Sequence, residues 1–385
     1  MTMSTDEKVV RDEADMNKLR EEARREGYDN FKEGGWFQRV VTKHIKKHAA
    51  EINAAHWEHL YPGLDAEERA TRVINKAIVK ASTAGAMASI GASTGELLSL
   101  FTEGLAAPIG LPAAVSSMVA EATYTAKLQI DLACDLASIY GVPFDPDDFG
   151  EVATLFGLAL EVDVTKKKED EETTEQKEAK KGVTASLMEL EDGEFAKRIG
   201  RKLLEESVMR NIIPVFGIAI SARWNWVATK KFAAAARKYA RYRHALRKAC
   251  NALKLAHVED PALLLEGAWL LATIDGDAGH EELLAMAIIL ESLPINAADL
   301  KLDGHWDDEE DWFERLQKAP PAMYDRLLDV LYLIAATDRE LAAAEKRFLR
   351  RLGKAIGREI DWHRVEGICK HLAEGEDPPI GFLSS

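Results

Sequence analysis

Two pairs of carboxylates in the C-terminal third of the chain could hold a cation. Asp275 precedes Glu282 by seven residues, and Asp338 precedes Glu345 by the same interval. Hard cations such as Ca²⁺ and Mg²⁺ prefer oxygen ligands, so four carboxylates meeting from two related corners would form a metal site. The same residues also suit helix capping, in which Asp caps the next helix and Glu stabilises its first turn. We favour capping, because the set of ligands is small and Arg339 adds a positive charge at the second corner.

Four of the ten histidines lie at helical spacings between residues 36 and 60. Intervals of three and four residues would place metal ligands on one helix face, and these histidines are His44, His48, His56 and His59. Lysines crowd the first pair, and no carboxylate or thiolate follows at a metal-ligand spacing. We therefore interpret the segment as a polar helix face.

Motifs of the common enzyme classes are missing from the sequence. There is no Ser or Cys nucleophile paired with a base, no Gly-x-x-x-x-Gly-Lys, no Gly-x-Gly-x-x-Gly, no His-Glu-x-x-His and no paired cysteines. The three cysteines are far apart and odd in number, which fits a reducing cytoplasm better than a disulfide framework. Residues 1–30 lack the apolar core of a signal peptide. We expect a non-enzymatic, cytoplasmic protein.

The stretch from Ile212 to Arg243 joins an apolar segment to a basic helix that carries Trp and Tyr. Residues 207–258 contain no Asp or Glu and eleven Lys and Arg, although the whole chain has a formal net charge of -15. This combination is typical of an element that lies on an anionic membrane. The alternative is a helix packed against an acidic face of the protein itself. The candidate membrane-surface residues are Arg223, Trp224, Trp226, Lys230, Lys231, Arg237, Lys238, Arg241 and Arg243, and the rings of Tyr239 and Tyr242 also suit the interfacial zone.

The tract from residue 81 to residue 120 is unusually rich in Ala, Ser and Gly. Its longest uncharged runs, 81–95 and 104–120, are shorter than the roughly 18 residues that a spanning helix requires, and two prolines interrupt the second run. Gly91 and Gly95 form a Gly-x-x-x-Gly pattern, which lets helix backbones approach closely. Interfacial insertion and a tightly packed helical hairpin both fit this tract.

Helix signals run through the whole chain and predict an all-α fold. Asp65 is a candidate N-cap, and Gly141 followed by Pro143 predicts a helix end. The charged run Asp307–Asp311 reads as the solvated start of a helix, with a second cation site or a partner surface as alternatives. Beyond residue 258, two apolar and amphipathic segments align at a constant offset of 63 residues.

The domain boundaries follow from these changes in composition. Residues 1–61 form a charged N-terminal helical segment, and residues 62–250 form a helical central domain with the small-residue hairpin and a charged insertion at 163–182. Residues 258–375 form a helical domain built as a two-fold pseudo-repeat, and residues 376–385 form a tail.

The central region resembles the EcsC family. Tyr140 and Gly141 match in part a helix-ending pattern of that family, while Pro214, Gly217 and Asn225 match its later Ile-Pro-x-x-Gly segment and the following Asn. The charged insertion falls between the two motifs. The resemblance implies a bacterial, all-helical, membrane-associated protein and no particular reaction.

The C-terminal repeat resembles the TerB-like helical domain, which is associated with tellurite resistance. The repeats of that domain carry Asp-Gly and then Glu seven positions after the Asp. Asp275, Gly276 and Glu282 follow the pattern, whereas Arg339 stands where the second unit would carry its Gly.

These features together predict a peripheral protein at the inner face of the plasma membrane. It would act as an adaptor or stress-response regulator that engages anionic lipid through the basic helix and a protein partner or a cation through the acidic C-terminal domain. The alternatives are a sensor of Ca²⁺ or Mg²⁺ and a soluble protein-interaction scaffold. The overall acidic charge argues against a nucleic-acid partner, and the sequence does not indicate an oligomeric state.

Overall fold

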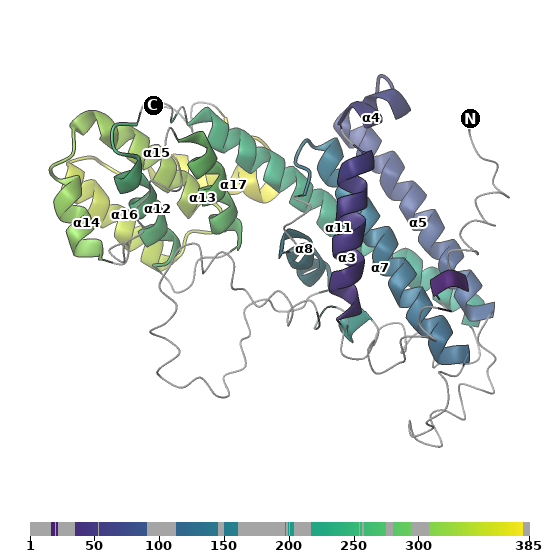
Figure 1. Ribbon diagram of the computed structural model, residues 1–385. Coiled ribbons are helices and arrows are strands. Elements are labelled where there is room, and N and C mark those ends of the chain that lie inside the picture. The colour runs from purple at the N-terminus through teal and green to yellow at the C-terminus, as the bar shows by residue number, and fades with distance from the viewer. Residues whose placement is uncertain are drawn as a thin grey trace, which may run out of the picture. The chain divides into compact units, whose positions relative to one another are not determined.

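The computed structural model describes residues 17–19, 21, 35–52, 54–90, 113–144, 150–160, 197, 199, 201–203, 217–253, 255, 258–274, 280–293 and 308–379. Every regular element within these ranges is a helix (Figure 1). The all-α fold predicted from the sequence is therefore confirmed.

The chain divides into two compact units within the long helix α11 (Gly217–Ala252). The described residues up to Arg237 belong to unit 1, and those from Lys238 onward belong to unit 2. The division falls earlier in the chain than residues 250–258, where the change in composition predicts it.

Unit 1 is organised around helix α7 (Ala113–Ile139), against which α3 (Trp36–Glu51), α4 (Ala54–Leu60) and α5 (Ala66–Ile90) pack (Figure 1). Helix α7 is buried at nearly every described position, because its sides are occupied by several neighbours at once. Helix α8 (Gly150–Leu160) joins the unit through an aromatic chain. The ring centroid of Phe156 lies 4.9 Å from that of Phe37 on α3 and 4.7 Å from that of Phe232 on α11.

Local signals explain where the helices of unit 1 start and stop. The Asp65 side chain accepts a hydrogen bond of 2.8 Å from the Glu68 backbone N–H, and Glu68 reciprocates at the Asp65 N–H, which makes a capping box at the start of α5. Gly141 has a φ of +72° at the end of α7, a left-handed conformation that glycine adopts without strain. The predicted N-cap and the predicted helix end are both confirmed.

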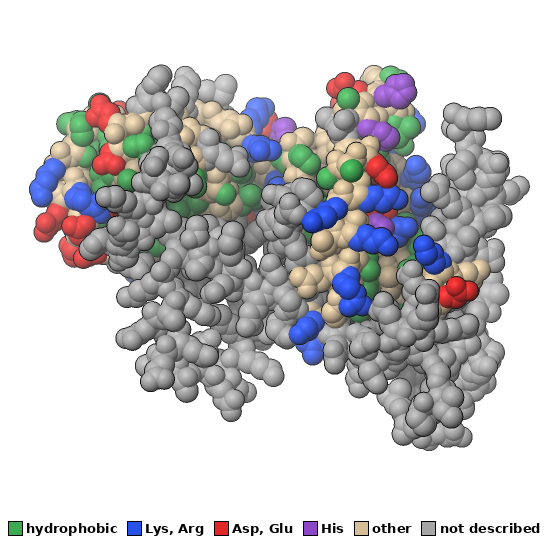
Figure 2. Space-filling model, in the orientation of Figure 1, with side chains coloured by type: hydrophobic (Ala, Val, Ile, Leu, Met, Phe, Trp, Pro, Cys, Tyr) green, Lys and Arg blue, Asp and Glu red, His purple; other side chains and the backbone are tan. Residues whose placement is uncertain are grey.

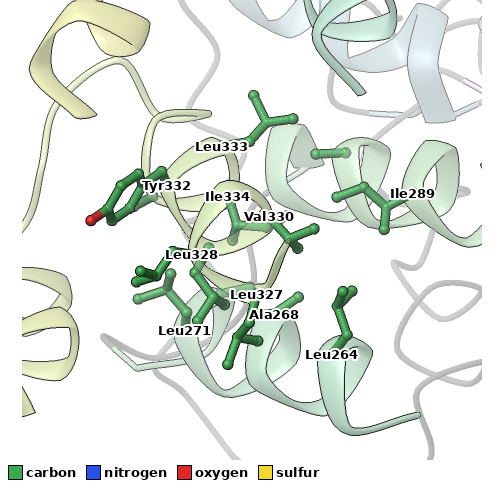
Figure 3. Packing of buried hydrophobic residues seen from close by; sticks show 14 of the residues in the cluster. Leu264, Ala268, Leu271, Ile289, Leu327, Leu328, Val330, Tyr332, Leu333 and Ile334 are labelled. Carbon is green, nitrogen blue, oxygen red and sulfur yellow. The ribbon is translucent and has the colours of Figure 1, made fainter. Parts of the chain in front are cut away.

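Unit 2 contains α12 (Pro261–Ala272), α13 (His280–Ser292), α14 (Glu309–Leu316), the 3₁₀ turn η3 (Pro321–Met323), α15 (Tyr324–Ala335), α16 (Ala343–Ile356) and α17 (Trp362–Glu374), together with the end of α11. Helices α12 and α15 are its interior pair, and both are buried along almost their whole length. Figure 3 shows Leu264, Ala268 and Leu271 of α12 gathered with Leu327, Val330 and Ile334 of α15.

The helix boundaries of unit 2 follow the sequence offset. Helix α15 begins and ends 63 residues after α12, and α16 begins 63 residues after α13. The aligned segments therefore form helices that begin at matching positions, and α12 and α15 have 12 residues each, whereas α13 has 13 and α16 has 14. A two-fold relation between the two helix pairs in space stays a prediction.

No helix among the described residues is long and apolar enough to cross a membrane. Several predictions fall outside the described residues: those for the tract 91–112, the insertion 163–182, Pro214 and the last six residues of the tail.

Candidate functional site

One face of α11 in unit 1 carries basic and apolar side chains together. Arg223, Trp226, Val227, Lys230 and Lys231 are all exposed and recur every three or four residues, which places them along one side of the helix. Trp226 is 43% exposed and Val227 is 45% exposed, among the few large apolar side chains on the described surface. The Lys230 ammonium lies 4.9 Å from the centroid of the Trp226 ring, a cation–π contact. These five residues are called the α11 surface below.

The opposite side of α11 is buried against α7. Asn225 donates a hydrogen bond of 3.0 Å from Nδ2 to Glu121 Oε1, and both side chains are 0% exposed. One turn further along each helix lie Thr229 and Thr125, whose hydroxyls are buried and make no hydrogen bond among the described residues. Asn225, the Asn of the sequence motif, is thus an interior residue, and it links α11 to α7 within a group of buried polar side chains.

Arg237 ends the unit 1 part of α11 in a three-residue cluster. Its guanidinium forms an ion pair with the Glu67 carboxylate on α5 and donates from Nε to the Tyr140 hydroxyl at 3.3 Å. Tyr140 in turn donates to Glu67 Oε1 at 2.7 Å. Burial, and then the hydrogen bond to Glu67, raise the pKa of Tyr140 to about 12. The cluster connects α5, α7 and α11, so Arg237 and Tyr140 have structural roles.

The other candidate membrane-surface residues occupy mixed environments. Lys238 is exposed, Arg241 is half-buried, and the side chain of Trp224 lies outside the described residues. Arg243 is only 8% exposed and its guanidinium lies 5.9 Å from the Tyr239 ring centroid. Tyr239 and Tyr242 are buried at 3% and 1% exposure, which corrects the expectation that they reach an interfacial zone.

Helix phase explains which basic residues of α11 face outward. Counting charges along the sequence does not show where neighbouring helices cover the helix, and they cover it at Arg237 and Arg243. Val227 was missed by the sequence analysis. Its spacing from Arg223 and Lys230 is the signal that identifies it as part of the same face.

The second acidic corner of unit 2 serves helix capping. The buried Glu345 carboxylate accepts a hydrogen bond of 2.6 Å from the Ala342 backbone N–H at the start of α16. Glu282 is also buried, in the first turn of α13, whereas Asp338 is exposed and Asp275 lies outside the described residues. Within the described ranges, no group of three or more His, Cys, Asp or Glu side chains could hold a metal ion.

Arg339 stands at the position where the TerB-like pattern has glycine. Its φ is +66°, the left-handed conformation that favours glycine. Its guanidinium lies 4.4 Å from the Tyr242 ring centroid and donates to Glu281 Oε1 at 3.2 Å. These contacts offset the backbone strain that a non-glycine residue has there.

The described acidic residues 308–311 form the N-cap and first turn of α14, as the sequence predicted. Asp308 accepts a hydrogen bond of 3.0 Å from the Asp311 backbone N–H and so caps the helix. Arg351 of α16 donates to both Glu309 and Glu310. The run is therefore partly neutralised by a neighbouring helix of its own unit.

His44 and His48 face into unit 1 and meet two carboxylates of α7. His44 Nδ1 lies 3.3 Å from Asp131 Oδ1, and His48 Nε2 lies 2.7 Å from Asp135 Oδ1. Burial raises the pKa of Asp135, while the hydrogen bond from His48 opposes that rise. His56 is exposed, as the interpretation of this segment as a polar helix face requires. That interpretation is corrected for His44 and His48, which are partly buried against α7. Both pairs are four residues apart in sequence, a signal for two facing helices that the sequence analysis did not use.

No family model, curated protein or solved structure matches this chain. The resemblances to the EcsC and TerB-like families therefore stay predictions from the sequence motifs.

Proposed function

We propose that this protein is a non-enzymatic adaptor that binds the anionic inner face of the plasma membrane through the α11 surface. The observation that supports this most is the exposure of Trp226 and Val227 among three basic side chains. Apolar groups that enter the headgroup region, flanked by cations that meet anionic lipid, are the two components of interfacial binding.

The energies are sufficient for reversible binding. Each Lys or Arg near an anionic leaflet contributes about 1 kcal/mol, so Arg223, Lys230 and Lys231 together supply roughly 3 kcal/mol. Burial of the exposed parts of Trp226 and Val227 adds to this at about 25 cal/mol per Å² of apolar area. Affinity of this kind falls as salt screens the charges.

A second group of basic residues in unit 1 adds to its positive potential. Figure 2 shows Lys and Arg side chains gathered over α3. Those on α3 are exposed at helical intervals and are Arg39, Lys43, Lys46 and Lys47. Their fields assist the approach of the unit to an anionic surface.

The cation-sensor and C-terminal partner functions receive less support. Glu345 is used for capping, and Glu309 and Glu310 are engaged by Arg351. A soluble scaffold that binds an acidic protein through the α11 surface is the alternative that the experiment must distinguish from membrane binding.

Co-sedimentation of the full chain with vesicles tests the proposal. Vesicles of phosphatidylcholine with phosphatidylglycerol should bind the protein at low salt and release it at high salt, and pure phosphatidylcholine should not bind it. Lys230→Glu/Lys231→Glu should abolish binding. Lys318→Glu/Lys370→Glu changes two exposed lysines of unit 2 by the same charge and should retain it. Failure of the unaltered chain to bind anionic vesicles would favour the soluble scaffold.

A further inference from the structure

A cavity of about 420 Å³ that opens to solvent lies between α3, α4, α5 and α7 of unit 1. Its size falls in the range of pockets that hold small organic ligands. The two His–Asp pairs of α3 and α7 form part of its lining. The lining shares no residue with the α11 surface, although it shares Lys47 with the basic residues of α3.

The charged lining of the cavity is weighted toward cations. Three helices contribute lysines, which are Lys47, Lys76, Lys80 and Lys127. Three acids also line the cavity, and two of them, Asp131 and Asp135, are engaged by His44 and His48. The lining therefore has a formal charge of +1 with all histidines counted as neutral. An anionic group would be attracted to it.

The remaining lining is apolar and aromatic. Trp57 is 4% exposed, and its indole N–H donates to the Ser138 hydroxyl at 3.2 Å, which fixes the orientation of the ring. Tyr61 stacks beside it with a centroid separation of 6.4 Å and an interplanar angle of 9°. Val73 and Leu128 complete an apolar wall from α5 and α7. A hydrocarbon or ring would be buried favourably against these side chains.

We propose that this cavity binds a small amphipathic anion. A carboxylate or phosphate group would pair with Lys76, Lys80 and Lys127, and the apolar body would lie toward Trp57 and Leu128. A purely inorganic anion leaves the apolar wall hydrated, and a neutral hydrocarbon makes no ionic contact with the lysines. The combined lining selects a molecule that has both parts.

Fluorescence titration of the full chain with 1-anilinonaphthalene-8-sulfonate, an aromatic anion, tests the proposal. Decanoate and decyl phosphate should displace the probe, and their relative potency shows which headgroup is preferred. Inorganic phosphate, which has only the charge, and decanol, which has only the apolar chain, should each require at least about tenfold higher concentration, since a tenfold change in affinity corresponds to about 1.4 kcal/mol.

Matched variants assign the signal to the cavity. Lys76→Ala/Lys80→Ala should weaken decanoate binding about tenfold or more, because each charge-assisted contact contributes strongly. Ala77→Phe places a ring in the cavity and should reduce binding with the helical circular dichroism signal retained. Trp226→Ala, on the α11 surface, and Lys318→Ala/Lys370→Ala should leave binding unchanged. Equal displacement by decanol and decanoate, or unchanged binding in both cavity variants, would overturn the proposal.

Discussion

Asn225 on α11 donates a hydrogen bond of 3.0 Å to Glu121 on α7, and neither side chain has exposed surface. A buried carboxyl group that loses a donor retains the cost of its desolvation. The hydrogen bond therefore holds α11, which carries the α11 surface, against the central helix α7 of unit 1. A substitution at Asn225 would disturb the α11 surface indirectly, by weakening the packing of α11.

Substitution of Asn225 tests the contribution of this hydrogen bond to stability. Asn225→Leu should lower the free energy of unfolding by about 2–3 kcal/mol, because it removes a donor from a buried carboxyl group. In a Glu121→Gln background the same substitution should cost roughly 1 kcal/mol, since a neutral amide is less expensive to leave without that donor. Urea denaturation followed by circular dichroism measures both values. Equal losses in the two backgrounds would show that the hydrogen bond is not what Asn225 contributes.

The raised pKa of Tyr140 predicts a loss of stability in alkali. The pKa is raised from the ordinary 10.0 to about 12, so folding favours the neutral phenol. The corresponding stabilisation is complete below pH 10 and is lost as the pH rises to about 12, because the unfolded tyrosine ionises first. The stability of the unaltered protein should fall more steeply in this window than that of Tyr140→Phe. If the stabilities of the two proteins fell equally with pH in this window, the raised pKa of Tyr140 would be contradicted.

A helical glycine of unit 2 has no room for a methyl group. A Cβ at Gly267 would lie 2.5 Å from Cζ2 of Trp312, whose buried indole donates to the Leu263 carbonyl at 2.9 Å. Gly267→Ala should therefore destabilise by about 1–3 kcal/mol through overpacking, although Ala in place of Gly ordinarily favours a helix. Gly35→Ala is the control, because a Cβ there meets nothing within 4 Å. The midpoints of thermal unfolding of both variants measure the difference. Equal midpoints would indicate that the Trp312 ring can move to make room for the added methyl group.

Two substitutions at Arg339 separate the contribution of its left-handed backbone to stability from that of its side chain. Arg339→Ala removes the contacts with Tyr242 and Glu281 but keeps the φ of +66°, whereas Arg339→Gly also relieves the strain. The Gly variant should be more stable than the Ala variant by about 1 kcal/mol, the usual cost of this conformation for a residue with a Cβ. A more stable Ala variant would indicate an ordinary backbone conformation in solution.

The parts of the fold that the sequence predicted are those specified locally. Asp65, Gly141 and Asp308 act through their immediate neighbours, so the ends of α5, α7 and α14 follow from residues three or four positions away. The offset of 63 residues likewise anticipates the bounds of α15 from those of α12.

The partners across helices were not predictable in this way. His48 and Asp135 are 87 residues apart, and neither sequence neighbourhood indicates the other. Lys230 and Arg243 look alike in a count of charge, yet one is exposed and the other buried, because exposure depends on which helices cover α11. The sequence predicts a basic helix, but which of its residues are exposed depends on how the helix packs against its neighbours.

The most direct test of membrane binding places a reporter on the α11 surface. The native cysteines are buried, and burial raises the pKa of Cys250 to about 12 and that of Cys369 to about 11, so a thiol label reacts first at an exposed Val227→Cys. Nitrobenzoxadiazole at this position should shift to the blue when phosphatidylglycerol vesicles are added, and nitroxide-labelled lipid should quench it. The same label at Lys370→Cys, in unit 2, should show neither change. Vesicle binding that leaves the label at position 227 in water, or no binding at all, would contradict the account.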